Sequence, residues 1–128
     1  DSSPFSRKPM NELSIIQKTY DLLKWYIPIL NRLPKDFRFS LGSRMSNTLY
    51  GLLENLLRAR FSRNKIELLE ALSGEMNILV YQTRLLHDFE LISTQRYEFA
   101  SAQLVELGDE LGGWLKQQVR QKQKRETT

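Results

Sequence analysis

Residues 97–114 have the sequence YEFASAQLVELGDELGGW, in which apolar side chains recur at helical intervals. Two rows with a spacing of seven share one helix face: Tyr97, Leu104 and Leu111, and Ala100, Leu107 and Trp114. Rows with this spacing form one apolar stripe, which a helix buries against its neighbours. The segment therefore predicts an amphipathic helix, and Ser93 is its best N-cap candidate because a serine hydroxyl accepts from free N–H groups.

Outward from this segment, the chain predicts three more helices, at about residues 11–33, 40–61 and 65–89. Pro34 ends the first of them, and Pro28 inside it predicts a bend. Asn64 and Glu67 have the spacing of a capping box at the start of the third. Because the connections are short, successive helices lie antiparallel. The predicted fold is all-α, an antiparallel up-down-up-down four-helix bundle.

Each of these three helices also has an apolar face. The predicted faces are Ile16, Leu23 and Leu30 with Thr19, Tyr26 and Leu33 in the first helix; Leu41, Met45, Leu49, Leu52 and Leu56 in the second; and Leu69, Leu72, Met76, Leu79, Thr83 and Leu86 in the third.

The chain has 128 residues and no cysteine, which indicates one domain without disulfides or thiolate metal sites. Residues 1–10 hold two prolines and three serines and are expected to form a flexible arm. Residues 11–120 form the predicted bundle, and 121–128 a basic flexible tail. No segment approaches the ~20 apolar residues of a membrane span. We therefore expect a cytoplasmic protein that contacts no membrane.

Charge is segregated along the chain. Residues 14–66 carry ten Lys or Arg against three acids, a balance of +7, whereas residues 67–113 sum to −7. Residues 114–128 return to +4, and the whole chain has a net charge of +4. If the two basic blocks meet in the fold, they form a positive surface suited to phosphate backbones, with the acidic block facing elsewhere.

Catalytic residues are hard to find in this composition. The only histidine is His87, and no cysteine or second histidine is present to complete a metal or nucleophile set. Acids on exposed helix faces are usually only solvated. We expect a structural or solvent-exposed role for His87, no enzymatic activity, no metal and no cofactor.

The candidate nucleic-acid-binding residues are the cations near the helix junctions and near the end of the fourth helix: Arg38, Arg44, Arg58, Arg60, Arg63, Lys65, Lys116 and Arg120. The two junctions lie at opposite ends of an up-down bundle, and the end of the fourth helix should lie near residues 58–65. Phe37 and Phe39 flank Arg38 and offer surfaces on which unpaired bases can stack. An acidic protein partner or simple surface patterning are the alternatives.

Gly108 and Gly112 lie four residues apart on one face of the fourth helix, where a second helix could approach closely. Trp114 follows as a large anchor. These three residues are the candidate oligomer interface; the alternatives are a contact within the chain or a helix end at the glycine pair.

Two motifs carry a family resemblance: PKDFRFSLG at residues 34–42 and LGGW at residues 111–114. With the surrounding residues 20–57 and 106–116, they resemble the accessory variability determinant (Avd) proteins of diversity-generating retroelements. The resemblance implies a four-helix bundle that assembles into a basic homopentamer, partners the reverse transcriptase of the retroelement, and binds template RNA without catalysing cDNA synthesis. It assigns no individual contact residues.

A related bundle family, encoded in intervening sequences of ribosomal RNA genes, typically has an Asn-Ile-Ala-Glu-Gly-like stretch in its second helix. Residues 47–51 read NTLYG here, which favours the retroelement family. We therefore expect a non-enzymatic accessory protein that binds RNA, or an RNA–DNA hybrid, through its basic surface and supports mutagenic cDNA synthesis. The alternative is a protein–protein adaptor of the intervening-sequence type with no retroelement role.

Overall fold

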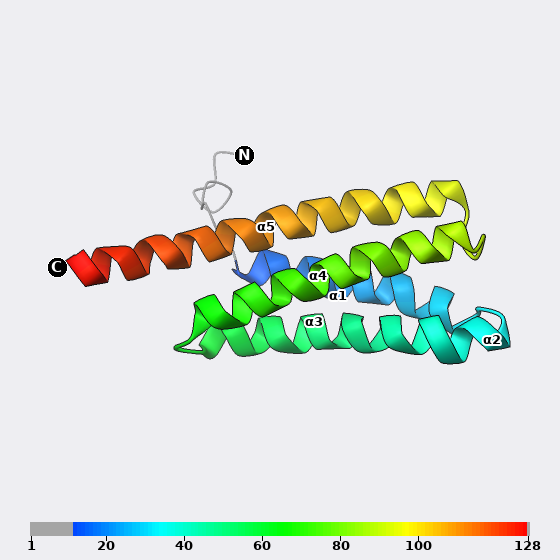
Figure 1. Cartoon of the computed structure of the whole chain (residues 1–128), viewed down its shortest axis with the longest axis horizontal. Coiled ribbons are helices and arrows are strands. Elements are labelled where there is room, and N and C mark those ends of the chain that lie inside the picture. The colour runs from blue at the N-terminus through cyan, green and yellow to red at the C-terminus, as the bar shows by residue number, and fades with distance from the viewer. Residues whose placement is uncertain (1–11, 128) are drawn as a thin grey trace.

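The structure, a computed structural model, describes residues 12–127. Its long helices are α1 (Glu12–Asn31), α3 (Ser43–Phe61), α4 (Lys65–Asp88) and α5 (Thr94–Thr127), and they run alternately up and down (Figure 1). Two short elements, α2 (Lys35–Phe37) and η2 (Arg38–Gly42), lead into α3. Both α1 and α4 pack against α3 and α5, so the four long helices form a ring around one core. With no strand in the described range, the predicted fold is confirmed.

The core follows the predicted faces closely in α3, α4 and α5. All six predicted positions of α4 are buried, and in α5 only Tyr97 of the six is half-buried. In α3 the four positions from Met45 to Leu56 are buried, whereas Leu41, in η2, is only partly buried. In each of these helices the buried positions recur at intervals of three and four residues, which places them on one helix face.

The buried face of α1 differs from the prediction. Ile15 and Leu22 are buried, whereas the predicted Ile16 and Leu23 are only partly buried. The chain has two adjacent apolar residues at each of these places, so a spacing of seven fits either member of the pair. Packing selects the pair that continues the stripe of Thr19, Tyr26 and Leu30, all of which are buried as predicted.

The helical segment that becomes α3 begins earlier than predicted. It starts at Lys35, directly after Pro34, rather than at Ser40. Pro34 is the N-cap residue, and its carbonyl accepts from the N–H groups of Phe37 and Arg38 at 2.9 and 2.8 Å. Residues 38–42 then form a wider π-turn, in which the Ser43 hydroxyl donates to the Arg38 carbonyl oxygen at 3.3 Å. That bond gives a partner to a carbonyl beside the wide turn.

The cap predictions have mixed outcomes. Ser93 lies just before α5, and its hydroxyl accepts from the Arg96 N–H at 3.1 Å, which confirms it as the cap. The Asn64 side chain makes no hydrogen bond to the backbone of α4. Its amide donates instead to the Glu67 carboxylate at 3.3 Å, so the prediction of a capping box was wrong. Pro28 lies inside α1, and the bend expected there stays a prediction.

The end of α4 has a residue in an unusual backbone conformation. Glu90 has a φ of 59°, the left-handed region that glycine normally occupies at this position. The N–H of Leu91 donates to the Leu86 carbonyl at 2.8 Å, and the N–H of Glu90 donates to the His87 carbonyl at 2.9 Å. These two bonds form a Schellman motif, which reverses the chain into α5.

The last helix is longer than expected. The sequence predicted a frayed end beyond Val119, but α5 remains helical to Thr127. The arm predicted for residues 1–10 lies outside the described residues, and the boundaries of arm and tail stay predictions. None of the helices between residues 12 and 127 is long and apolar enough to cross a membrane.

Candidate nucleic-acid interface

Six predicted cations lie toward the end of the bundle where α3 turns into α4. We call them the α3–α4 cluster: Arg58, Arg60, Arg63, Lys65, Lys116 and Arg120. Arg58 and Arg60 lie in the last turn of α3, where positive charge offsets the negative end of the helix dipole. Arg63 lies in the tight turn, and Lys65 is the first residue of α4. The turn thus concentrates four of the cations within eight residues of chain.

Helix lengths bring the two cations of α5 beside this turn. The chain places α4 and α5 antiparallel, with 24 and 34 residues respectively. Counting 24 residues from the start of α5 reaches residue 117, which lies level with the start of α4. The remaining ten residues extend ~15 Å beyond it at ~1.5 Å per residue. Lys116 and Arg120 therefore flank the turn, and both are exposed.

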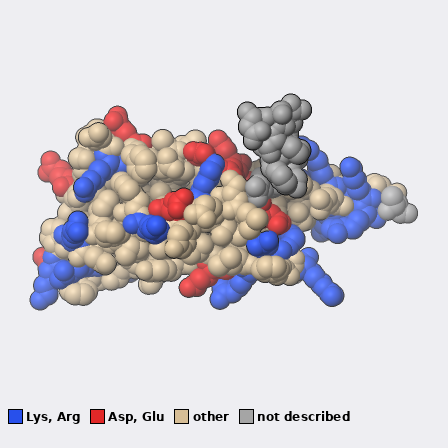
Figure 2. Space-filling model, turned by 180° about the vertical axis from the view of Figure 1, so that it is seen from behind, with Lys and Arg blue, Asp and Glu red and all other residues tan. Residues whose placement is uncertain are grey.

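The projecting end of α5 is itself basic. It carries Lys122, Lys124 and Arg125 against Glu126, and all four side chains are exposed. Figure 1 shows this end passing beyond the α3–α4 turn, and in Figure 2 the same end is largely blue. The end of the last helix therefore passes the α3–α4 turn, as the chain direction predicts.

The members of the α3–α4 cluster are not equally available. The Lys65 ammonium donates to the carbonyls of Ala59, at 2.8 Å, and Arg60, at 2.6 Å. These carbonyls belong to the last turn of α3, so Lys65 caps that helix. Arg58 donates to the Asn55 amide oxygen at 2.7 Å on its own helix. Lys65 is therefore committed to structure, whereas Arg58 is held by one exposed side-chain contact.

Arg60 has two neighbours that sequence reasoning missed. Its Nε lies 3.9 Å from a carboxylate oxygen of Glu12, and its guanidinium lies 5.2 Å from the centre of the Phe61 ring. Phe61 is 78% exposed. The ring thus holds the guanidinium of Arg60 by a cation–π contact. The signal was present in the adjacent pair Arg60-Phe61, which repeats the pair Arg38-Phe39 at the other end of α3.

Arg38 and Arg44 do not join the α3–α4 cluster. Arg38 lies in η2 and Arg44 in the first turn of α3, at the opposite end of that helix. Figure 2 shows Lys and Arg dominating the projecting end of the molecule, whereas at the opposite end Lys and Arg lie beside carboxylates. The predicted set is thus divided into two positive regions, as expected from the chain direction.

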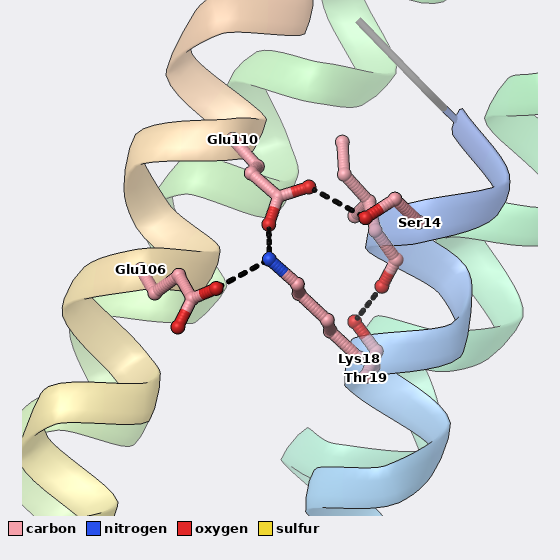
Figure 3. A network of polar contacts seen from close by, with 6 residues as sticks. Ser14, Lys18, Thr19, Glu106 and Glu110 are labelled. Atoms are coloured by element: carbon pink, nitrogen blue, oxygen red, sulfur yellow. Dashed lines mark hydrogen bonds and ion pairs between the residues drawn. The ribbon is translucent and has the colours of Figure 1, made fainter. Parts of the chain in front are cut away.

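The basic and acidic blocks of sequence contact one another, contrary to the expectation that the acidic block faces elsewhere. The Lys18 ammonium of α1 pairs with the carboxylates of Glu106 and Glu110 on α5 (Figure 3). The Ser14 hydroxyl donates to Glu110 at 3.1 Å. Hydrogen bonds to Glu106 and then to Glu110 raise the pKa of Lys18 above its usual 10.5, outweighing the effect of burial. The two carboxylates therefore balance the positive charge of Lys18 locally.

The predicted oligomer interface changes in part. Trp114 is fully buried among the core residues of its own chain, so it is not an exposed anchor. Its indole Nε1 has no hydrogen-bond partner within the described residues. Gly108 and Gly112 are open: a methyl group added at either would meet no atom within 4 Å. A close helix contact within the chain therefore does not explain the two glycines.

Possible catalytic groups are scattered or engaged. His87 stacks on Tyr97 with ring centroids 4.5 Å apart, and its Nε2 lies 3.2 Å from the Thr94 hydroxyl. The imidazole thus packs at the α4–α5 turn, which is the structural one of the two roles predicted for it. Between residues 12 and 127, no group of three or more His, Asp or Glu side chains gathers as metal ligands would.

Three comparisons with known proteins bear on this site. The sequence model of a family described as bAvd-like matches residues 13–118. A solved structure from Bacteroides thetaiotaomicron, described as a protein of unknown function from the S23 ribosomal protein family, is similar with a TM-score of 0.73. It is 19% identical, and the match covers 81% of this chain and 93% of that one, so it supports the fold alone. A search of curated proteins finds no match.

Proposed function

The chain belongs to the bAvd-like family, and from this premise we propose that it is a non-enzymatic accessory protein of a diversity-generating retroelement. In this role it binds template RNA or an RNA–DNA hybrid through the α3–α4 cluster. It also associates with the reverse transcriptase and so supports mutagenic cDNA synthesis. The polymerase, not this bundle, carries out the chemistry.

One observation carries the nucleic-acid part of the proposal: α5 overshoots the bundle and presents exposed cations beside the α3–α4 turn. Arg63, Lys116 and Arg120 make no ion pair within the described residues. Cations that lack internal partners can neutralise phosphates and release the counterions condensed on nucleic acid. Guanidinium groups also bind phosphate through two parallel hydrogen bonds.

The association with a reverse transcriptase is supported by family membership alone. Assembly into a homo-oligomer is supported by a surface feature as well. α4 has an outward stripe of exposed apolar residues, Ile78, Tyr81 and Leu85, and Gly74 continues it toward the α3–α4 turn. A lone bundle would place polar residues on such a face. We propose that this stripe packs against another copy in a homo-oligomer, with five subunits by the family resemblance.

Filter binding with a structured RNA over a salt series tests the nucleic-acid proposal. Lys65 is engaged in capping α3, which leaves five cations of the cluster. If each contacts one phosphate, log affinity should fall with log salt with a slope of about −4.5, at ~0.9 per contact. Replacing Arg58, Arg60 and Arg63 with Glu should abolish binding at moderate salt and leave the helix content intact. Affinity retained by this triple variant at moderate salt would refute the assignment of the site.

A matched control separates the site from net charge. Replacing Lys24, Arg84 and Arg96 with Glu makes the same change in net charge, and all three side chains are exposed away from the α3–α4 turn. This control should keep most of the affinity. If both triple variants lose binding equally, total charge rather than the cluster drives it. If the unmodified protein binds no RNA at low salt, the proposal fails in favour of a protein–protein adaptor.

A further inference from the structure

A polar pocket lies where the end of α1, the η2 turn and the start of α3 meet. Its volume is about 280 Å³. The polar and aromatic side chains that line it are Asn31, Arg38, Phe39, Ser43, Ser46 and Asn47. A volume of this size, at the small end of ligand pockets, suits one small planar group rather than a helix or a folded domain.

Local packing forms this pocket. Gly42 is buried, and a methyl group added there would lie 3.3 Å from the Phe37 carbonyl oxygen and 3.5 Å from the Leu30 carbonyl oxygen. The missing side chain lets the end of α1 approach the η2 turn closely. Arg38 and Phe39 are the first two residues of the wide turn, and both line the pocket.

The lining groups have unused capacity for hydrogen bonds. The Nε of Arg38 is buried and has no partner within the described residues. In the same part of the chain, the side chains of Asn31, Ser46 and Asn47 make no hydrogen bond to other groups. No carboxylate lines the pocket. It therefore combines a cation with uncharged donors and acceptors, a set that fits an anion attached to a polar ring.

Phe39 supplies the remaining part of such a site. Its ring is 67% exposed, and the Arg38 guanidinium lies 5.0 Å from the ring centre. A large exposed aromatic side chain is costly in water and gains when a flat apolar surface covers it. Every nucleobase has such a surface, and arginine beside the ring strengthens the stacking.

We propose that this pocket binds one unpaired nucleotide of a bound RNA. The base stacks on Phe39, its polar edge meets the amides of Asn31 and Asn47, and Arg38 contacts the adjoining phosphate. This site rests on the proposed nucleic-acid function and gives it a preference for RNA that carries a single-stranded segment. It lies at the end of the bundle opposite the α3–α4 cluster, so the two regions contact different parts of one RNA.

The second arginine–phenylalanine pair provides a matched control. Arg60 lies over Phe61 in the same way as Arg38 lies over Phe39, and both rings are exposed. Phe61 lies at the other end of α3 and does not line this pocket. Phe61→Ala therefore removes an exposed ring of the same kind without touching the groups that would recognise a base edge.

The experiment compares a blunt RNA duplex with the same duplex extended by a short single-stranded overhang that contains 2-aminopurine. Affinities are measured by filter binding, and stacking by quenching of the 2-aminopurine fluorescence. For the unmodified protein, the overhang should raise affinity about five- to a hundredfold, the range expected for one stacked base. Phe39→Ala should lose this gain and the quenching, whereas Phe61→Ala should keep most of both.

The outcomes separate the two proposals. If neither RNA binds, the proposed function fails and this site with it. If the blunt duplex binds but the overhang adds nothing, or if both Phe variants lose the gain equally, only the nucleotide site is overturned. Should Phe39→Ala reduce helix content, Asn47→Ala decides, because the exposed amide can be removed without disturbing the core. It should reduce the gain from the overhang several-fold, and an unchanged gain would overturn the site.

Discussion

The hydrogen bond between Tyr26 and Thr83 crosses the core of the bundle, and its removal is expected to have a pH-dependent cost. Tyr26 on α1 is fully buried, and its hydroxyl lies 2.6 Å from the Thr83 hydroxyl on α4. The Thr83 hydroxyl also donates to the Leu79 carbonyl at 2.8 Å. Since that bond uses the proton of Thr83, Tyr26 must donate to Thr83. The bond thus joins α1 to α4, each of which packs mainly against α3 and α5.

Unequal costs follow from this direction of donation. Tyr26→Phe removes the donor but leaves Thr83 bonded to Leu79, so the free energy of unfolding should fall by about 1 kcal/mol. Thr83→Val leaves the Tyr26 O–H buried without an acceptor, which costs roughly 1–3 kcal/mol. The double variant leaves no orphaned donor and should cost less than the sum of the single changes. Urea unfolding at pH 7 measures all three.

The pH dependence comes from the phenol. Burial raises the pKa of Tyr26 from 10.0 to about 12, although the bond to Thr83 opposes the shift. The folded state therefore holds this proton more tightly than the unfolded state. Its contribution is complete below pH 10 and is lost as the pH rises through 12, by about 2.7 kcal/mol at 1.36 kcal/mol per unit. Tyr26→Phe lacks this loss.

The two effects together predict a crossover. At pH 7 the unmodified protein is the more stable, but roughly between pH 10 and 11 its advantage over Tyr26→Phe should vanish and then reverse. Urea unfolding of both proteins across this range gives the difference directly, and other titrating groups cancel in it. A difference that stays constant to pH 12, or a double variant whose cost equals the sum of the single costs, would refute the reasoning.

Four further substitutions test the packing and the surface. Gly51→Ala should stabilise the fold by about 1 kcal/mol, because a methyl group there meets no atom within 4 Å. At Gly42 a methyl group would lie 3.3 Å from the Phe37 carbonyl oxygen, so Gly42→Ala should lose that gain to strain. Equal gains in thermal unfolding would contradict this expectation. Glu90→Gly should stabilise by roughly 1 kcal/mol, since glycine adopts its φ of 59° without strain, and an unchanged denaturant midpoint would count against it. Tyr81→Glu, at an exposed position of the α4 stripe, should yield a folded monomer by light scattering if that stripe mediates assembly, and an unchanged mass would exclude the stripe.

The sequence predicts the helices and most of the core because their signal is local. In α4 and α5, six positions recur at alternating intervals of three and four, so one face fits the period throughout, even where Leu68-Leu69 and Leu85-Leu86 are adjacent. In α1, the pairs Ile15-Ile16 and Leu22-Leu23 allow two choices, and only contact with α3 and α5 selects between them. The sequence also did not predict the η2 turn, because this turn depends on a contact between segments: how closely Gly42 approaches the end of α1.

The candidate site shows a different limit. Chain direction correctly predicts that residues 58–65 and the end of the last helix meet, because helix length and antiparallel order are readable from the sequence. It does not reveal what each cation touches. Lys65 caps α3 by reaching back across a turn. Lys18 pairs with two carboxylates of α5, a helix far away in the chain. Both contacts depend on distances between segments, which the sequence does not show.

The end of α5 shows how the absence of an apolar stripe should be interpreted. Residues 120–125 have no face to bury, but Arg, Gln and Lys are all good helix formers, and nothing breaks the helix. The missing stripe therefore indicates only that the segment has no apolar face to bury. A helix places residues 116, 120 and 124 on one face at intervals of ~6 Å, whereas a frayed tail would leave them unordered. A helical end loses less conformational entropy on binding than a frayed tail would. The same cations can therefore bind phosphates more tightly when they stand on a helix.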